Sequence, residues 1–143
     1  MADLEQLMRR GTDAWNNRDE AGLDALSTED FTLSASGGVE TKGIEASHEF
    51  NRTWWTAFPD GKLEILECIV SGNTAVVRGR FTGTHTGVFK TPMGDVQPTN
   101  KQLDGRYAQI DHFRGEKAAE SYLLFDHMEV MEQLGLVPTP ATA

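Results

Sequence analysis

The chain has 143 residues, a length that predicts a single domain over residues 1–143 with one hydrophobic core. Hydrophobic residues make up 38% of it and charged residues 24%, a balance typical of a soluble globular protein and too apolar for a disordered one. The 22 acidic side chains outnumber the 13 lysines and arginines, so the formal net charge is -9. Without a basic cluster, nucleic acid and anionic membrane surfaces are excluded as expected partners.

The compartment and the redox chemistry follow from what the sequence lacks. The segment Met1–Glu5 has no basic stretch followed by an apolar run, and no stretch approaches the ~20 apolar residues of a membrane-spanning helix. A cytoplasmic protein is therefore expected. Cys68 is the only cysteine, which excludes an internal disulfide. The sequence has no His-Glu-x-x-His motif, so no metal site is expected.

The first third of the chain is predicted to be mainly helical. Leu4, Leu7, Met8 and Trp15 share one face at helical spacing, after a capping residue at Asp3. Further elements are a helix over residues 20–26, a strand over 31–35, a hairpin turn at 36–38, and a helix over 43–58 whose face carries Ile44, His48, Asn51, Trp55 and Phe58.

From residue 62 onward the apolar period changes from the helical one to two, which indicates strands. The predicted strands are 63–70, 74–84, 102–113 and 117–125, with a loop over 86–100 and a last helix over 127–134. The ordered core is expected over about residues 3–136, followed by a short C-terminal tail. Helices followed by mainly antiparallel strands predict an α+β domain, a cone in which a curved mixed or antiparallel sheet wraps around helices. The apolar interior of such a cone is a natural small-molecule cavity.

Three motifs resemble the SnoaL-like polyketide cyclases of the nuclear transport factor 2-like superfamily. They are Phe58-Pro59-Asp60, then Gly83-Thr84-His85-Thr86-Gly87 before a proline-containing loop, and Asp126 leading to Met131–Leu136. The resemblance implies the cone-shaped α+β fold and a homodimer that pairs through the sheet. It also implies an enzyme that closes a ring of a polyketide by an intramolecular aldol step, with no metal and no cofactor.

The resemblance carries over unevenly to single residues. Asn51 matches a pocket asparagine on the long helix, Trp15 stands where the first helix closes one side of the cavity, and His85 matches a histidine at the end of its strand. The acid of the cyclases falls at Leu123 in this sequence, and their strand histidine falls at Gln109. These two residues cannot do the same chemical work.

Asp111 is the first candidate for acid–base chemistry. It shares a strand face with Tyr107 and Gln109, so it faces the cavity if Gln109 does. Burial in an apolar cone would raise the pKa of its carboxyl group toward the value that a general acid or base needs. The alternative is a solvated aspartate at the strand end that pairs with Arg114.

His85, predicted at the rim of the cone, is the second candidate proton carrier; the alternative is a hydrogen-bonded structural histidine at the start of a loop. The amide of Asn51 could hold a substrate oxygen or tie down a loop. Tyr107 could donate to an oxyanion or serve as a core aromatic. Asp126 has the position of a helix cap, and a role in the site stays open.

The converging helix face and strand faces predict one enclosed pocket. Its walls are expected to include Trp15, Asn51, Trp55, Phe81, Tyr107, Gln109 and Leu123. The apolar Phe89 and Met93 of the loop over residues 86–100 are expected to close its mouth.

Three functions are compatible with these residues. The favoured one is a cofactor-free enzyme, such as a cyclase or isomerase, that moves a proton next to a carbonyl of an apolar or polyketide-like molecule, with Asp111 or His85 as acid and base. A non-catalytic binder of a small apolar ligand is the alternative. The third is a dimeric interaction module whose interface includes Arg78 and Arg80 on the outer sheet face.

Overall fold

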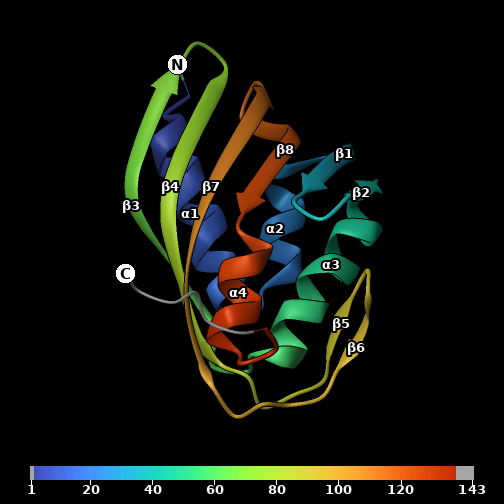
Figure 1. Cartoon of the computed structure of the whole chain (residues 1–143). Helices are drawn as coiled ribbons and strands as arrows, with labels where there is room; N and C mark the ends of the chain where they lie inside the picture. The colour runs from blue at the N-terminus through green and yellow to red at the C-terminus, as the bar shows by residue number, and fades with distance from the viewer. Residues whose placement is uncertain (1, 138–143) are drawn as a thin grey trace.

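One curved sheet organises the molecule. In a computed structural model, which describes residues 2–137, six strands lie in the order β2-β1-β8-β7-β4-β3, and β5 and β6 form a separate hairpin (Figure 1). The helices are α1 (Leu4–Asn16), α2 (Glu20–Ala25), α3 (Ile44–Ala57) and α4 (His127–Gln133). The strands are β1 (Ser27–Ala35), β2 (Val39–Lys42), β3 (Lys62–Ser71), β4 (Thr74–Thr84), β5 (Phe89–Thr91), β6 (Gly94–Val96), β7 (Gln102–Arg114) and β8 (Lys117–Phe125). The predicted α+β cone with a mixed sheet is confirmed.

Aspartate caps begin the helices where the sequence predicted them. The carboxylate of Asp3 accepts a hydrogen bond from the backbone N–H of Gln6 at 3.1 Å, at the start of α1. Asp126 accepts from the N–H groups of Met128 at 2.9 Å and Glu129 at 3.3 Å, at the start of α4. These bonds satisfy donors that have no partner within the helix. Asp126 therefore serves as a helix cap.

The strand predicted over residues 31–35 begins four residues earlier, at Ser27. It runs parallel to β8, with Ser27 opposite Ala118 and Leu33 opposite Ser121. Pairing with a strand from the other end of the chain, rather than local sequence, sets where β1 starts. Because β1 and β8 are neighbours, their inward side chains contribute to the same wall.

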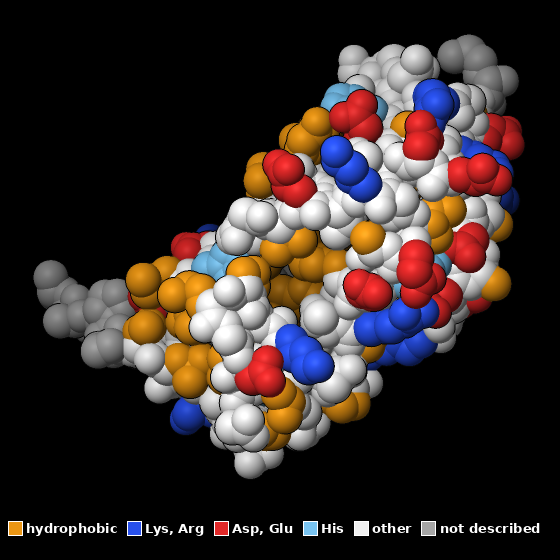
Figure 2. All heavy atoms as spheres, turned by 90° about the vertical axis from the view of Figure 1, so that its right-hand side faces the viewer, with side chains coloured by type: hydrophobic (Ala, Val, Ile, Leu, Met, Phe, Trp, Pro, Cys, Tyr) orange, Lys and Arg blue, Asp and Glu red, His pale blue; other side chains and the backbone are white. Residues whose placement is uncertain are grey.

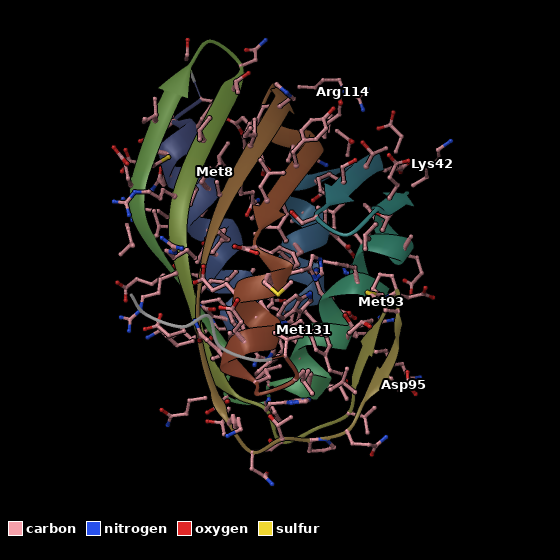
Figure 3. All side chains as sticks on the ribbon, in the orientation of Figure 1. Met8, Lys42, Met93, Asp95, Arg114 and Met131 are labelled. Atoms are coloured by element: carbon pink, nitrogen blue, oxygen red, sulfur yellow. The ribbon has the colours of Figure 1, made fainter. Side chains whose placement is uncertain are left out.

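The segment predicted as a loop over residues 86–100 contains the hairpin β5–β6. Phe89 is buried in it, with ring centroids 4.8 Å from Trp54 and 5.8 Å from Phe58. Met93, at the tip of the hairpin, is 93% exposed (Figure 3). The prediction that Phe89 and Met93 close the cavity is therefore wrong. The short turn holds the Met93 side chain out in solvent, and Phe89 is buried in the core without lining the cavity.

Two clusters of buried side chains make up the core. One joins α1 to the sheet and contains Leu4, Met8, Ala75, Val77, Tyr107, Phe113 and Ala118. The other joins α3 and α4 to the sheet and contains Ala57, Phe58, Phe81, Phe89, Leu103, Val130 and Leu134. Among the residues described, no helix is long and apolar enough to cross a membrane. The predicted C-terminal tail lies outside them, apart from residue 137.

Candidate functional site

A cavity of about 190 Å³ lies between the helices and the inner face of the sheet. Figure 2 shows the hollow from outside, with hydrophobic side chains in its depth and charged side chains around it. Members of both core clusters line it. Of the residues predicted for the site, the structure brings seven together in its walls: Trp15, Asn51, Phe81, Tyr107, Gln109, Asp111 and Leu123.

Trp55 does not line this cavity, contrary to the prediction, and Trp54 does. The cavity face of α3 carries Ser47, Asn51 and Trp54, a stripe rotated from the predicted one that ran through His48, Asn51 and Trp55. Both stripes have helical spacing and both contain Asn51, so the periodicity alone did not distinguish them. Trp55 instead packs against the ring of Trp15, with centroids 5.6 Å apart.

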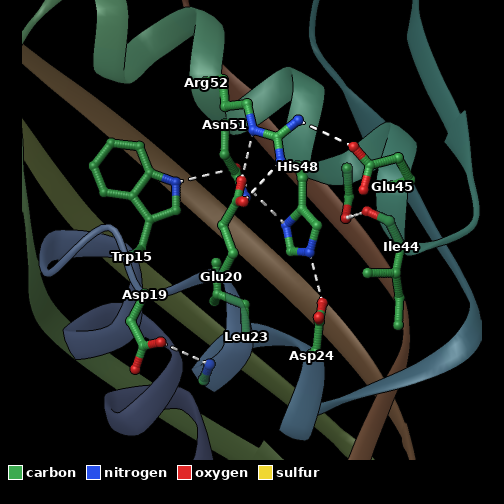
Figure 4. A network of polar contacts seen from close by, with 12 residues as sticks. Trp15, Asp19, Glu20, Leu23, Asp24, Ile44, Glu45, His48, Asn51 and Arg52 are labelled. Carbon is green, nitrogen blue, oxygen red and sulfur yellow. Dashed lines mark hydrogen bonds and ion pairs between the residues drawn. The ribbon is translucent and has the colours of Figure 1, made fainter.

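His48, on the other side of this helix, holds α3 to α2 instead of facing the cavity. Its Nε2 lies 2.6 Å from a carboxylate oxygen of Asp24. Arg52, one turn further along α3, donates to both carboxylate oxygens of Glu20 at 2.7 Å (Figure 4). These contacts fix the helical phase that places Asn51 in the cavity wall.

His85 also lies outside the cavity lining. Its side chain is fully buried between the rings of Phe58 and Phe89, and its Nδ1 accepts a hydrogen bond from the backbone N–H of Thr99 at 3.2 Å. Burial lowers the pKa of the imidazole, and a backbone hydrogen bond with Gly87 opposes this effect. His85 is thus the structural histidine of the alternative reading, and its predicted place at the cavity is wrong.

Asp111 is a buried acid in the cavity wall. Its side chain is 6% exposed, and the amide Nε2 of Gln109 donates to its Oδ1 at 3.0 Å. Burial raises the pKa of the carboxyl group, while hydrogen bonds from Ser121 and Gln109 act in the opposite direction. Arg114 pairs with Asp30 rather than with Asp111, so the predicted alternative of a solvated, arginine-paired aspartate is wrong.

Tyr107 lies four residues from Asp111 along β7 in the direction of α4, and Gln109 lies between them on the same strand face. Its side chain is buried, and this burial raises the pKa of the phenol to about 12. The hydroxyl therefore keeps its proton at neutral pH and can donate a hydrogen bond. Gly79, directly opposite on β4, leaves room for the ring.

Asn51 and Trp15 form the polar contact on the helical side of the cavity. The indole Nε1 of Trp15 donates to Oδ1 of Asn51 at 3.1 Å (Figure 4). The predicted alternative, in which Asn51 ties down a loop backbone, is not what the side chain does. The contact joins α1 to α3 and leaves the amide in the cavity wall.

Sequence reasoning missed Ser121, which is buried beside Asp111 and lines the cavity. The signal was present, because Ser121 lies two residues before Leu123 on β8 and so shares its strand face. Trp54 was missed because the stripes through Trp54 and Trp55 on α3 have the same helical spacing. Over residues 2–137, the structure has no group of three His, Cys, Asp or Glu side chains placed to hold a metal ion.

The family model for SnoaL-like polyketide cyclases matches residues 5–134. No curated protein matches the sequence.

Solved structures give the same fold at low sequence identity. A candidate SnoaL-like polyketide cyclase from Jannaschia sp. superposes with a TM-score of 0.83 at 20% identity, over 94% of this chain and 92% of the other. AclR, a candidate hydroxylase from Streptomyces galilaeus, gives 0.82 at 23% identity, over 99% and 86%. IdmH, a candidate polyketide cyclase from Streptomyces antibioticus, gives 0.80 at 20% identity, over 94% and 99%. At these identities the likeness establishes the fold and leaves the reaction to the residues of the site.

Proposed function

Because the chain belongs to the SnoaL-like polyketide cyclase family, we propose that it is a cofactor-free enzyme that moves a proton next to a carbonyl group of a small, largely apolar molecule. The observation that carries this proposal is Asp111, a buried carboxyl group with a raised pKa in the wall of an apolar cavity. An acid–base catalyst works best when its pKa lies near the working pH, and an aspartate in water lies far below it.

The proposed step needs only groups of the cavity and the substrate. The carboxylate of Asp111 takes a proton from the carbon next to a ketone, and the electron pair of that C–H bond moves toward the carbonyl oxygen to give an enolate. Asn51 and Tyr107 hydrogen-bond this oxygen. The enolate carbon then forms a bond to a second carbonyl carbon of the same molecule, and the resulting alkoxide takes the proton back from Asp111. Gln109 holds the carboxyl group in place through its 3.0 Å hydrogen bond.

Hydrogen exchange on a simple ketone tests this step without the natural substrate. The bicyclic ketone 1-tetralone, dissolved in D2O with the protein, should lose its α-proton signal in NMR spectra faster than in buffer. Asp111→Asn keeps the shape and removes the titrating proton, so the exchange rate should fall by about 100-fold, a usual contribution of one acid–base group. Asp95→Asn, the same change on the exposed hairpin, should leave the rate unchanged. Equal rates for Asp111→Asn and the wild type would show that another group moves the proton.

A non-catalytic binder is the second candidate, and one observation favours it. Leu123, which occupies the position of the cyclase acid, lines the cavity and lies opposite Gln109 in the register of β7 and β8. An apolar wall at that point suits retention of a ligand better than proton transfer. If 1-tetralone binds without accelerated exchange, and cavity variants change only its affinity, the binder is the correct function.

We also propose that the functional unit is a homodimer that pairs through the outer face of the sheet. Four apolar residues on adjacent strands form a row there in register: Ile69, Val76, Ile110 and Tyr122. Ile69 is 57% exposed, and Leu124, on the next row, is 52% exposed. A second copy would cover this row.

The arginines predicted for this interface already have partners within the chain. Arg78 pairs with Glu67 and Arg80 with Asp104. The apolar row across the strands is therefore the better candidate for contact with a second copy. Sedimentation velocity should give a dimer for the wild type and a monomer for Ile110→Glu. A monomeric wild type at micromolar concentration would contradict the proposal.

A further inference from the structure

Two amide side chains line the cavity, Asn51 from α3 and Gln109 from β7. A primary amide has one end that donates hydrogen bonds, the NH2 group, and one end that accepts them, the carbonyl oxygen. In each of these side chains one end already has a partner within the protein. The other end is what a ligand in the cavity would meet.

The donating end of Asn51 is the free one. The indole N–H of Trp15 can only donate, so the atom of Asn51 that lies 3.1 Å from it must be the carbonyl oxygen. Within residues 2–137, Nδ2 of Asn51 has no hydrogen-bond partner. Trp15 is itself held firmly, because the guanidinium of Arg18 lies 5.3 Å from its ring centre and Trp55 packs beside it. The amide therefore cannot turn without losing its bond to a fixed donor.

The accepting end of Gln109 is the free one. Its Nε2 donates to Oδ1 of Asp111 at 3.0 Å. In the ionised form in which Asp111 takes the substrate proton, its carboxylate can only accept, so the NH2 end of Gln109 faces it. Oε1 of Gln109 has no hydrogen-bond partner in the described part of the chain. The two amides thus present opposite hydrogen-bonding ends, a donor on the helical wall and an acceptor on the sheet wall.

We infer that the cavity selects a largely apolar ligand that presents an acceptor, such as a ketone oxygen, to Asn51 and a donor, such as a hydroxyl or enol, to Gln109. A ligand that fills the cavity but lacks either group leaves a desolvated amide end unpaired, which weakens binding. This inference rests on the proposed function in one respect, that the cavity takes a small molecule. It holds whether that molecule is turned over or only bound.

Matched probes that differ in one group test the helical wall. Isothermal titration calorimetry should show that 1-tetralone binds about tenfold more tightly than tetralin, the hydrocarbon without the oxygen, because it makes one more hydrogen bond. Asn51→Asp keeps an oxygen for Trp15 and replaces the NH2 group by a second oxygen, so the tenfold preference should disappear while tetralin still binds. Asn73→Asp, the same substitution on an exposed turn, should keep the preference.

A second variant tests whether Trp15 sets the orientation. Trp15→Phe keeps an aromatic wall but removes the N–H group, so the Asn51 amide becomes free to turn. With Gln109→Leu in both proteins to remove the acceptor of the sheet wall, the protein that keeps Trp15 should bind 1-tetralone more tightly than indole, whose ring N–H can only donate, and Trp15→Phe should reduce this preference. At the sheet wall, the wild type should prefer indole, a donor only, to indene, a hydrocarbon of the same shape, and Gln109→Leu should remove this preference.

The outcomes separate this inference from the function. If ketone and hydrocarbon bind the wild type equally, or if Asn51→Asp keeps the ketone preference, the inferred polarity is wrong although the cavity is a binding site. If no probe binds, the proposed function fails and the inference fails with it. If the preferences appear as expected but Asp111→Asn does not slow proton exchange, the acid–base proposal is wrong and the inferred polarity is supported.

Discussion

The phenol ring of Tyr107 occupies the space in which a side chain at Gly79 would lie. The two residues are partners across β4 and β7, and a Cβ atom on Gly79 would come within 2.3 Å of Cζ of Tyr107. The absence of a side chain at Gly79 therefore lets the ring lie directly against the backbone of β4. The ring belongs to the core cluster that joins α1 to the sheet. Packing of the Tyr107 ring thus explains why a glycine lies at position 79, in the interior of a strand.

Gly79→Ala should accordingly destabilise the protein by about 1–3 kcal/mol, because the ring of Tyr107 must move or the strands must separate. Urea denaturation measures this loss. Gly105→Ala is the matched control, since the residue also lies in a strand with its Cα toward the cavity, and the nearest atom to a Cβ there is 3.8 Å away. It should change the free energy of unfolding by less than about 0.5 kcal/mol. Equal losses in both variants would contradict the packing explanation.

The hairpin β5–β6 gives a second pair of contrasting sites. Phe89→Ala should cost about 3–5 kcal/mol, because it empties a place in the core between Trp54 and Phe58. Met93→Ala should cost less than about 0.5 kcal/mol, because the side chain at the hairpin tip is almost fully exposed. Urea denaturation of the two variants and the wild type measures both losses in the free energy of unfolding. A large loss for Met93→Ala would mean that its side chain packs against the protein in solution.

Strand periodicity predicted the sheet side of the cavity well. For a strand over residues 102–113, the two-residue period places Tyr107, Gln109 and Asp111 on one face. The structure has all three in the cavity wall. The period is robust because a shift by one residue would move every inward side chain of the strand to the solvent face. The cap at Asp126 was equally predictable, since its bonds are local.

The helical side could not be predicted to the same precision. A helix turns by about 100° per residue, so stripes through Trp54 and Trp55 look alike in the sequence. The choice between them depends on His48 and Arg52, which pair with residues of α2 that are distant in sequence. The parallel pairing of β1 with β8 and the short hairpin around Phe89 also depend on contacts between remote segments. That residues 1–143 form one domain stays a prediction.

Arg18, just after α1, joins this helix to the turn that follows α3, which leads to a third prediction. Its guanidinium donates to the backbone oxygens of Phe58, Pro59 and Gly61 in the turn after α3, at 3.0–3.3 Å. Arg18→Met keeps much of the aliphatic chain but removes the donors, so the free energy of unfolding should fall by about 1.5–3 kcal/mol, the range for hydrogen bonds from a charged group. Arg9→Met, which breaks one exposed pair with Glu5, should cost less than about 0.5 kcal/mol. Equal urea midpoints for Arg18→Met and Arg9→Met would contradict this role of Arg18.

The last prediction concerns how stability depends on pH through Asp111. Burial raises the pKa of its carboxyl group in the folded protein above the value of about 3.9 that the unfolded chain has. Between these two pKa values the folded state binds more protons than the unfolded state, so this group makes the free energy of unfolding fall as the pH rises. Below the unfolded pKa the penalty is absent, and above the folded pKa it is fully present.

Asp111→Asn removes this penalty, because the amide stays neutral at every pH and can still accept from Gln109. Other carboxylates, such as Asp60 and Asp104 with their lowered pKa values, titrate in both proteins and cancel when the two are compared. The stability of the variant minus that of the wild type should therefore be smallest near pH 4, rise with pH, and level off once Asp111 is ionised in the folded wild type. Urea denaturation at half-unit steps from pH 4 to pH 8 measures this difference, and the pH at which it levels off gives an estimate of the pKa that a general acid or base would use. A difference that stays constant over the whole range would show that Asp111 titrates alike in the folded and unfolded states, and the carboxyl group would then have no special environment on which to base catalysis.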